Sequence, residues 1–236
     1  MNHAPRVNDH GQPIGPALPG WAPAPFPDVT PMQGRWCRVE PLLELHADEL
    51  YDELCGPGND ALWTYLKDGP FRLREEFVTY IEARATATDS VSVLIRDANG
   101  VACGLASYLR IDRANGAVEV GNIILGSRLQ RTTAATEAMR LLAGHVFDLG
   151  YRRYEWKCDA LNAPSQRAAE RLGFVHEGTF RQAVVYKGRS RDTDWWAITD
   201  ADWPWVRRAL DAWLVPENFV DGVQVQSLEA LRASAG

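Results

Sequence analysis

The 236-residue sequence lacks the features that would tie it to a membrane, a disulfide framework or nucleic acid. No apolar run approaches the roughly 18 residues of a membrane-spanning helix, and no signal peptide is recognisable. The four cysteines lie far apart without a Cys-x-x-Cys pair, and the five histidines show no ligand spacing. No block of Lys and Arg stands out at a net charge of −6. These absences predict a soluble cytoplasmic protein with reduced thiols and no bound metal, whose partners include neither nucleic acid nor a membrane.

Proline is concentrated at one end of a chain that otherwise has enough apolar residues for one core. The hydrophobic content is 46%, so a single domain is the default. Residues 1–33 hold eight of the fourteen prolines, which excludes a helix or a central strand there. We expect an extended, partly ordered N-terminal arm that lies across the domain through Trp21 and Phe26.

From residue 34 onward, strand and helix patterns alternate. The periodicity predicts strands at 34–42, 90–97, 102–111, 117–125, 153–158, 181–187 and 192–198, and helices at 43–54, 71–85, 134–149, 164–172 and 202–214. The Asn-Gly pairs at 99–100 and 115–116 predict antiparallel hairpins. This order predicts an α/β (α+β) domain over 34–200, with a mixed, mostly antiparallel central sheet of about seven strands flanked by helices. Residues 201–236 add a C-terminal helix and a tail that either packs on the sheet or reaches a partner subunit.

Residues 118–174 carry the pattern most closely linked to chemistry. A buried strand at 118–125 is followed by a polar turn at 126–133 and then by apolar residues at helical spacing. Unpaired N–H groups and the helix dipole at such a turn favour a phosphate. An ordinary crossover with a polar loop has the same geometry, so the pattern alone leaves both interpretations open.

Two motifs favour the phosphate site. Residues 130–138 (QRTTAATEA) resemble the acyl-CoA pyrophosphate loop of the GCN5-related N-acetyltransferases (GNAT), in the style of the RimJ/RimL ribosomal-protein acetyltransferases. Residues 162–165 (NAPS) and 168–174 (AAERLGF) resemble the next motif of that superfamily. Thr133 stands where the family loop has a glycine. It must therefore keep a negative φ with its N–H free, or contribute its hydroxyl as a donor.

The resemblance implies which residues contact an acyl-CoA co-substrate. Backbone groups at the end of the preceding strand would face the pantetheine arm where two central strands separate, and the N–H of Leu125 or a neighbour would stabilise the oxyanion. Asn162 and Ser165 match family positions that contact CoA, and Arg167 could reach a phosphate; as alternatives they are a turn residue, an early-helix polar residue and a solvated charge. The full set of predicted contacts is Ile123, Ile124, Leu125, Gln130, Arg131, Thr132, Thr133, Ala134, Ala135, Asn162, Ser165 and Arg167.

Direct attack of an amine on a thioester also needs a base and a proton for the leaving thiolate. Glu119 is the predicted base, because it is a carboxylate within an apolar strand. Its alternative role is an ion pair with Arg110 or Lys157. Ser165 and Tyr186 are the candidate acids, and Tyr186 could instead be a core residue.

The sequence therefore predicts an N-acyltransferase that moves an acetyl group from acetyl-CoA to a primary amine of a protein N-terminus, a peptide or a small molecule. One alternative is succinyl-CoA or another acyl-CoA as donor, with Arg181, Arg189 and Arg191 near a carboxylate or forming a solvated face. Another is a non-catalytic acyl-CoA-binding regulatory module. A homodimer through the C-terminal strands or tail is compatible with the sequence, which does not identify the amine.

Overall fold

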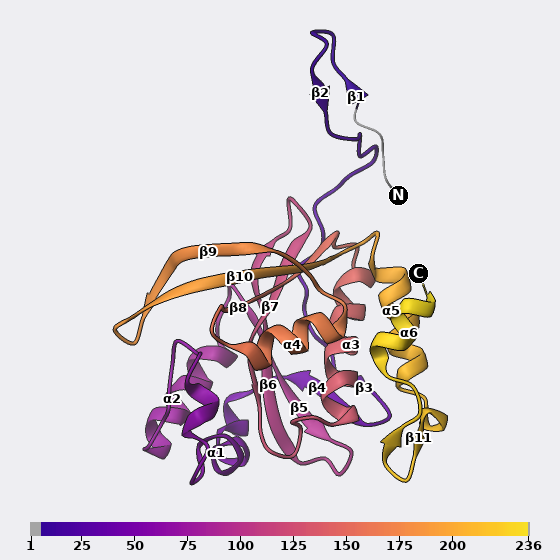
Figure 1. Cartoon of the computed structure of the whole chain (residues 1–236). Coiled ribbons are helices and arrows are strands. Elements are labelled where there is room, and N and C mark those ends of the chain that lie inside the picture. Colours follow the sequence, from indigo (N-terminus) through magenta and orange to yellow (C-terminus); the bar gives the residue numbers. More distant parts are fainter. Residues whose placement is uncertain (1–5, 236) are drawn as a thin grey trace.

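One eight-stranded sheet organises the computed structural model, which describes residues 6–235 (Figure 1). The strand order is β3-β4-β5-β6-β7-β8-β10-β9, and only β7 and β8 run parallel. The strands are β3 Met32–Gln33, β4 Cys37–Pro41, β5 Val91–Asp97, β6 Ala102–Asp112, β7 Ala117–Leu125, β8 Arg153–Asp159, β9 Val175–Tyr186 and β10 Arg189–Thr199. The predicted mixed, mostly antiparallel sheet is confirmed, and the two-residue edge strand β3 brings it to eight strands.

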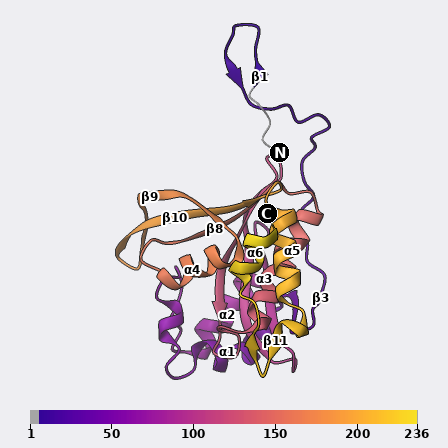
Figure 2. The same ribbon diagram turned by 45° about the vertical axis from the view of Figure 1, so that its right-hand side comes forward.

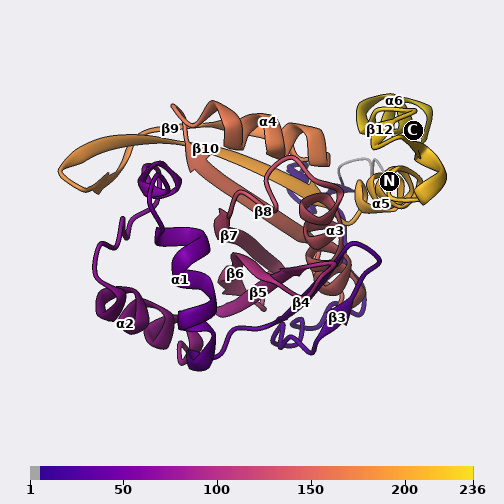
Figure 3. The same cartoon turned by 90° about the horizontal axis from the view of Figure 1, so that it is seen from below.

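Helices cover both faces of the sheet (Figure 3). Helices α1 (Ala47–Cys55) and α2 (Arg74–Ala85) pack on one face, and α3 (Thr133–Asp148) packs on the other. Alternate residues of a strand point to opposite faces, so Leu94 joins the α1–α2 core while Val93 and Ile95 join the α3 core. The other helices are α4 Ala163–Leu172, α5 Trp203–Trp213 and α6 Leu228–Ala235, with 3-10 turns at Glu44–His46, Asp60–Trp63 and Pro216–Asn218.

The predicted elements are present with small shifts at their ends. The predicted helix at 43–54 is a 3-10 turn followed by α1, and both Asn-Gly turns join antiparallel strands. Gly173 closes α4 in the left-handed conformation, at φ 101°. Strand β9 begins at Val175, six residues before the predicted start. It is an edge strand that is exposed along most of its length, so its early residues show no apolar alternation.

The N-terminal arm has two parts. Strands β1 (Arg6–Val7) and β2 (Pro13–Ile14) form a hairpin that projects from the body (Figure 1). From Trp21 onward the arm follows the domain, as expected: the Trp21 indole donates to the carbonyl of Ala114 at 2.9 Å, and Tyr151 donates to that of Pro25 at 2.9 Å. Phe26 is half-buried. Residues 1–5 of the predicted arm lie outside the described residues.

The tail after α5 folds back on that helix. Helix α6 packs against α5 (Figure 2), and Leu228 is buried between them and the core. Between the helices lies the hairpin β11 (Phe219–Val220) and β12 (Val223–Gln224), where Gln224 accepts a hydrogen bond from the Trp213 indole at 2.9 Å. The tail thus packs on α5 and α4 rather than on the sheet. Within residues 6–235, no helix has the length and apolarity to cross a bilayer.

Candidate active site

The two parallel strands at the centre of the sheet separate halfway along. Strands β7 and β8 pair from Ala117 and Arg153 only as far as Val120 and Trp156, although β7 continues to Leu125. Beyond that point β7 stays paired with β6 and β8 stays paired with β10, so the sheet opens between β7 and β8 alone. A register shift against β6 and a left-handed Asn122 (φ 48°) mark the bend. The separation expected from the resemblance is present.

The gap exposes the backbone of Leu125. Gly126 donates to the carbonyl of Cys103 at 2.9 Å, and Gly104 faces Leu125 in register. Because bonded and non-bonded pairs alternate in an antiparallel ladder, the N–H of Leu125 points away from β6 and into the gap. This is the position predicted for an oxyanion donor.

The turn after β7 presents free N–H groups at the start of α3. Thr133 is the first residue of the helix, and the left-handed residue is Arg131, at φ 62°. Thr132 caps the helix: its hydroxyl accepts from the N–H of Ala135 at 3.2 Å and donates to the carbonyl of Leu129 at 2.7 Å. The N–H groups of Thr133 and Ala134 have no intrahelical partner in this first turn. Thr133 thus fulfils the first of its two predicted alternatives.

A carboxylate of α1 fixes the beginning of this turn. Glu53 Oε1 accepts from the N–H of Arg128 at 3.1 Å and from the hydroxyl of Ser127 at 3.3 Å. Glu53 of α1 therefore holds the loop at its first residues, before it reaches α3. This contact could not be predicted from local patterns, because the two elements are more than seventy residues apart.

A cavity of about 400 Å³ lies beside the start of α3, and we call it the α3–α4 cavity. Strand β7, helices α3 and α4, and the C-terminal segment form its walls. Its lining residues are Ile123, Leu125, Arg131, Thr132, Ala135, Thr136, Met139, Trp156, Ala168, Arg171, Leu172, Trp213 and Gln224.

Arg171 places an uncompensated positive charge in that wall. Its guanidinium donates to Thr136 Oγ1 at 3.0 Å and lies 4.6 Å from the centre of the Trp213 ring. No carboxylate within residues 6–235 forms an ion pair with it. Burial, and then the nearby Arg232, lower the pKa of Arg171, so a bound anion would relieve both effects. Arg167, one turn earlier on α4, is exposed and lines neither cavity.

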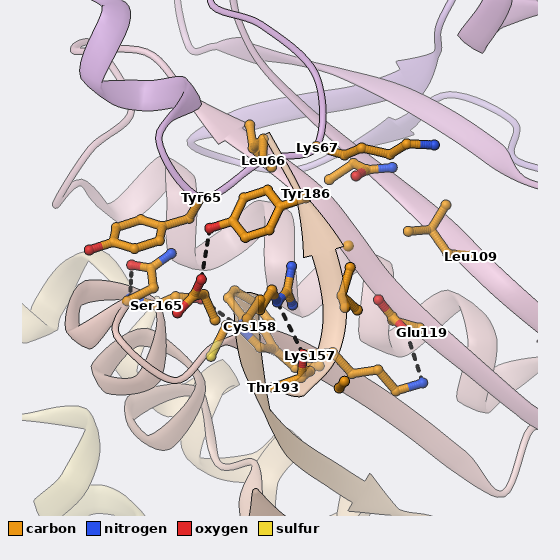
Figure 4. A pocket seen from close by; sticks show the side chains of 18 of the residues that line it. Tyr65, Leu66, Lys67, Leu109, Glu119, Lys157, Cys158, Ser165, Tyr186 and Thr193 are labelled. Atoms are coloured by element: carbon orange, nitrogen blue, oxygen red, sulfur yellow. Dashed lines mark hydrogen bonds and ion pairs between the residues drawn. The ribbon is translucent and has the colours of Figure 1, made fainter. Parts of the chain in front are cut away.

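A second cavity, of about 880 Å³, is lined by strands β6 to β10 and by residues 65–67, and we call it the β9–β10 cavity; Figure 4 shows side chains that line it. It is lined by Tyr65, Leu66, Lys67, Leu109, Arg110, Glu119, Val120, Gly121, Asn122, Ile123, Trp156, Lys157, Cys158, Asp159, Asn162, Ser165, Phe180, Ala183, Val184, Val185, Tyr186, Lys187, Arg191, Thr193 and Trp195. Ile123 and Trp156 also line the α3–α4 cavity. The two cavities therefore meet where β7 and β8 separate.

Glu119 is held by two cations in the wall of the β9–β10 cavity. Its Oε2 lies 2.5 Å from Arg110 Nη1 and 3.0 Å from Lys157 Nζ. Lys157 also contacts Glu155 at 2.7 Å and lies 3.8 Å from the centre of the Trp195 ring. Both ion pairs named as the alternative role of Glu119 are present. They leave its carboxylate facing the cavity with its charge already balanced.

Asp159 is a buried carboxylate of the same cavity that sequence reasoning missed. Its side chain accepts from the Tyr186 hydroxyl at 2.7 Å and from the N–H of Leu161 at 2.8 Å. Burial and the bond to Asp159 raise the pKa of Tyr186. Asp159 has no ion pair within residues 6–235. One signal could have revealed it: the residue lies on the same face of β8 as Glu155 and Lys157, at the strand end that leads into α4.

Asn162 and Ser165 occupy the start of α4 beside this carboxylate. Asn162 caps the helix by accepting from the N–H of Ser165 at 3.2 Å. The Ser165 hydroxyl accepts from the Trp156 indole at 2.9 Å and lies beside the Cys158 thiol, toward which it can donate its own proton. Both residues line the β9–β10 cavity and sit close to the junction formed by Trp156.

Several predicted contacts have side chains outside both cavities. Ile124 points to the α1–α2 core, because its neighbours Ile123 and Leu125 face the other side of the strand. The Gln130 amide donates to the carbonyl of Leu125 at 2.9 Å. The set outside both cavities is Ile124, Gln130, Thr133, Ala134 and Arg167. The first four offer a ligand only their backbone or an outer contact.

Fold and site together define a class of protein: an α/β domain with two central parallel strands that separate beside two cavities, one at a helix N-terminus and one along a hairpin. The acetyltransferase (GNAT) domain family matches residues 38–175. The structure of a GCN5-related N-acetyltransferase from Brucella melitensis is 42% identical, covers 92% of this chain and 100% of its own, and superposes with a TM-score of 0.89. A probable GNAT-family acetyltransferase from Chromobacterium violaceum is 36% identical over 82% of this chain and 98% of its own, with a TM-score of 0.77.

The chain belongs to the GNAT acetyltransferase family and is an acyl-CoA-dependent N-acetyltransferase. RimL, a ribosomal L7/L12 α-N-protein acetyltransferase, is 21% identical over 70% of this chain and 91% of its own, with a TM-score of 0.62; this likeness shows the fold alone. No curated protein matches the chain. Within residues 6–235, no group of three or more His, Cys, Asp or Glu side chains could hold a metal ion.

Proposed function

We propose that the enzyme transfers an acetyl group from acetyl-CoA directly to a primary amine, with the donor in the α3–α4 cavity and the acceptor in the β9–β10 cavity. The observation that carries this proposal is the meeting of the two cavities at Ile123 and Trp156, where β7 and β8 separate. A thioester carbonyl at that junction would be open to an amine from the other side. No covalent acyl-enzyme is required.

The start of α3 suits the CoA pyrophosphate. The N–H groups of Thr133 and Ala134 face outward, and Arg131 and Arg171 line the adjoining cavity without carboxylate partners among the described residues 6–235. Backbone donors, the helix dipole and two guanidinium groups form a strong anion site. Ile123 and Leu125 would flank the pantetheine arm.

Three groups would then serve the chemistry at the junction. As the amine nitrogen bonds to the carbonyl carbon, the N–H of Leu125 would stabilise the oxyanion. The carbon–sulfur bond then breaks, and the thiolate takes a proton. Ser165 is better placed to give that proton than Tyr186, whose own proton is donated to Asp159 and whose pKa is raised. Glu119 stays the predicted base, with two cations competing for its lone pairs.

Calorimetric titration with acetyl-CoA, succinyl-CoA and free CoA tests the donor site and its preference. Wild type should bind all three through the shared pyrophosphate, and Thr133→Trp should abolish binding by covering the first turn of α3. Tighter binding or faster turnover of succinyl-CoA would show that succinyl-CoA, rather than acetyl-CoA, is the donor. Failure of wild type to bind any CoA species would refute the proposal.

A protein N-terminus as acceptor, in the RimJ/RimL manner, is a narrower proposal supported by the two motifs. A large cavity open along the β9–β10 hairpin can admit an extended peptide. Mass spectrometry of an amino-terminal peptide library incubated with acetyl-CoA would show this activity. A homodimer and a cytoplasmic location stay predictions; sedimentation analysis tests the former.

A further inference from the structure

The charges of the β9–β10 cavity differ from the charge of the whole chain. The chain carries a net charge of −6, whereas the cavity wall has five cationic side chains and two carboxylates. The cations are Lys67, Arg110, Lys157, Lys187 and Arg191, and the carboxylates are Glu119 and Asp159. The local field therefore favours an anionic group, whatever the overall charge suggests.

Ion pairing removes three of these seven charges from consideration. Glu119 is shared by Arg110 and Lys157, and Lys157 is further bound by Glu155. What is left is one carboxylate, Asp159, and three cations that have no carboxylate partner within residues 6–235. The wall thus offers one unbalanced negative position and a larger unbalanced positive region.

Asp159 is suited to an ammonium group. It is 5% exposed, and its two hydrogen bonds come from a neutral hydroxyl and a neutral N–H. Each carboxylate oxygen can accept more than one bond, so both keep acceptor capacity. A buried carboxylate without a counter-cation gains more from a bound cation than one that is already paired. It also lies at the end of β8, beside Ser165 and the junction where the thioester would sit.

Arg191 is suited to a carboxylate. Its Nε donates to the Thr193 hydroxyl at 3.1 Å, and its two terminal nitrogens have no acceptor within residues 6–235. Tyr186 joins the two positions, since its hydroxyl bonds Asp159 and its ring centre lies 5.8 Å from the Arg191 guanidinium. Lys187, at the same end of the hairpin, donates to the carbonyl of Trp63 and adds positive charge.

We infer that the acceptor is an amine that also carries a carboxylate, with its ammonium at Asp159 and its carboxylate at Arg191. This inference rests on the proposed function and narrows its acceptor to zwitterionic amines such as amino acids. A polyamine would bring a second positive charge to the cationic side of the cavity, so such substrates should be poor.

A matched series of acceptors tests the inference through thiol release from acetyl-CoA. The series is 4-aminobutyrate, 4-aminobutyramide and 1,4-diaminobutane, which present a negative, neutral or positive group at the same distance from the amine. Leucine and leucinamide form a second pair. We expect kcat/KM to fall about tenfold at each step from the carboxylate to the amide to the diamine, the range of one charge-assisted hydrogen bond.

Variants of the two positions sharpen the test. Arg191→Gln should reduce the preference for 4-aminobutyrate over its amide to near one, and Asp159→Asn should raise KM for all the amines. Arg181→Gln is the matched control, because Arg181 is exposed on the same hairpin and lines neither cavity. It should keep the wild-type preference.

Three results would overturn the inference. They are equal use of the diamine, an unchanged preference in Arg191→Gln, and no acetylation of any listed amine by protein that binds acetyl-CoA. In each case the donor site stands. Should Arg191→Gln impair only succinyl-CoA as donor, the carboxylate belongs to the acyl group and the acceptor class is wrong. Failure of the wild-type protein to bind acetyl-CoA would instead refute the proposed function.

Discussion

Lys157 Nζ lies 3.0 Å from Glu119 Oε2, and each side chain is only 5% exposed. Glu119 and Lys157 flank the last paired residues of the two parallel strands, Val120 and Trp156, so the pair joins the strands where they separate. It can therefore serve the sheet, the chemistry or both, and the two roles predict different behaviour of the same substitutions.

Glu119→Gln should destabilise the protein by about 1–3 kcal/mol, less than a fully orphaned buried charge, because Lys157 keeps Glu155 and Arg110 is exposed. If Glu119 is the base, its replacement should also lower kcat about a hundredfold or more. Urea unfolding and steady-state rates measure the two effects. The double variant Glu119→Gln/Lys157→Met should be less stable than Glu119→Gln and no more active, because Glu155 then keeps only Arg153. Recovery of the rate in the double variant would make the pair purely structural.

Arg171→Met should weaken CoA binding about tenfold or more, because it removes an uncompensated cation from the α3–α4 cavity. Arg167→Met, one turn away on the same helix but outside both cavities, provides the control and should bind as wild type does. Titration calorimetry gives the two affinities, and thermal unfolding checks that loss of the contact with Trp213 has not unfolded the end of α5. Equal loss in both variants would mean that α4 contributes charge only at long range.

The thiol of Cys158 should be inert at neutral pH although it lines the β9–β10 cavity. Burial is the main cause that raises its pKa to about 11. Alkylation by iodoacetamide should therefore be slow at pH 7.5 and accelerate as the pH approaches that value. Cys158→Ala should keep turnover within a few fold of wild type. Trapping of an acyl group on Cys158 by mass spectrometry would contradict direct transfer.

Acid should weaken the network around Lys157. Burial alone would raise the pKa of Glu155, but hydrogen bonds and charges from Lys157 and Arg153 lower it below its ordinary value of 4.5. Since the folded-state pKa is the lower one, the stabilisation is present above pH 4.5 and is lost as the pH falls through the folded value. The difference in unfolding free energy between wild type and Glu155→Gln should shrink between pH 6 and pH 3. A constant difference would rule out this linkage.

The sheet and the donor loop were accessible from sequence because local patterns determine them. Apolar runs and alternation predicted β5 to β8, the Asn-Gly pairs predicted two hairpins, and the helical spacing of apolar residues placed the start of α3 within a residue. The exposed edge strand β9 has no such alternation, and its first six residues were missed. Local pattern succeeds where one face of an element is buried and the other is not.

The side chains of the site were harder to predict, because their positions depend on which face of one element packs against another element. Arg167 and Arg171 differ by one turn of α4, yet only Arg171 reaches the cavity, where the C-terminal segment supplies Trp213. Glu119 was singled out as a carboxylate in an apolar strand, but two partners on neighbouring strands neutralise it. Asp159 was not predicted because only the folded structure shows that this buried carboxylate has no cation beside it among residues 6–235.

The position of Gln224 in the wall of the α3–α4 cavity makes that cavity depend on a segment outside the sheet. The last strand of the sheet ends at Thr199, whereas Trp213 and Gln224 follow it in the chain. The sheet can therefore be complete while the cavity still lacks a side. Local opening of this segment would remove one wall of the cavity without unfolding the sheet.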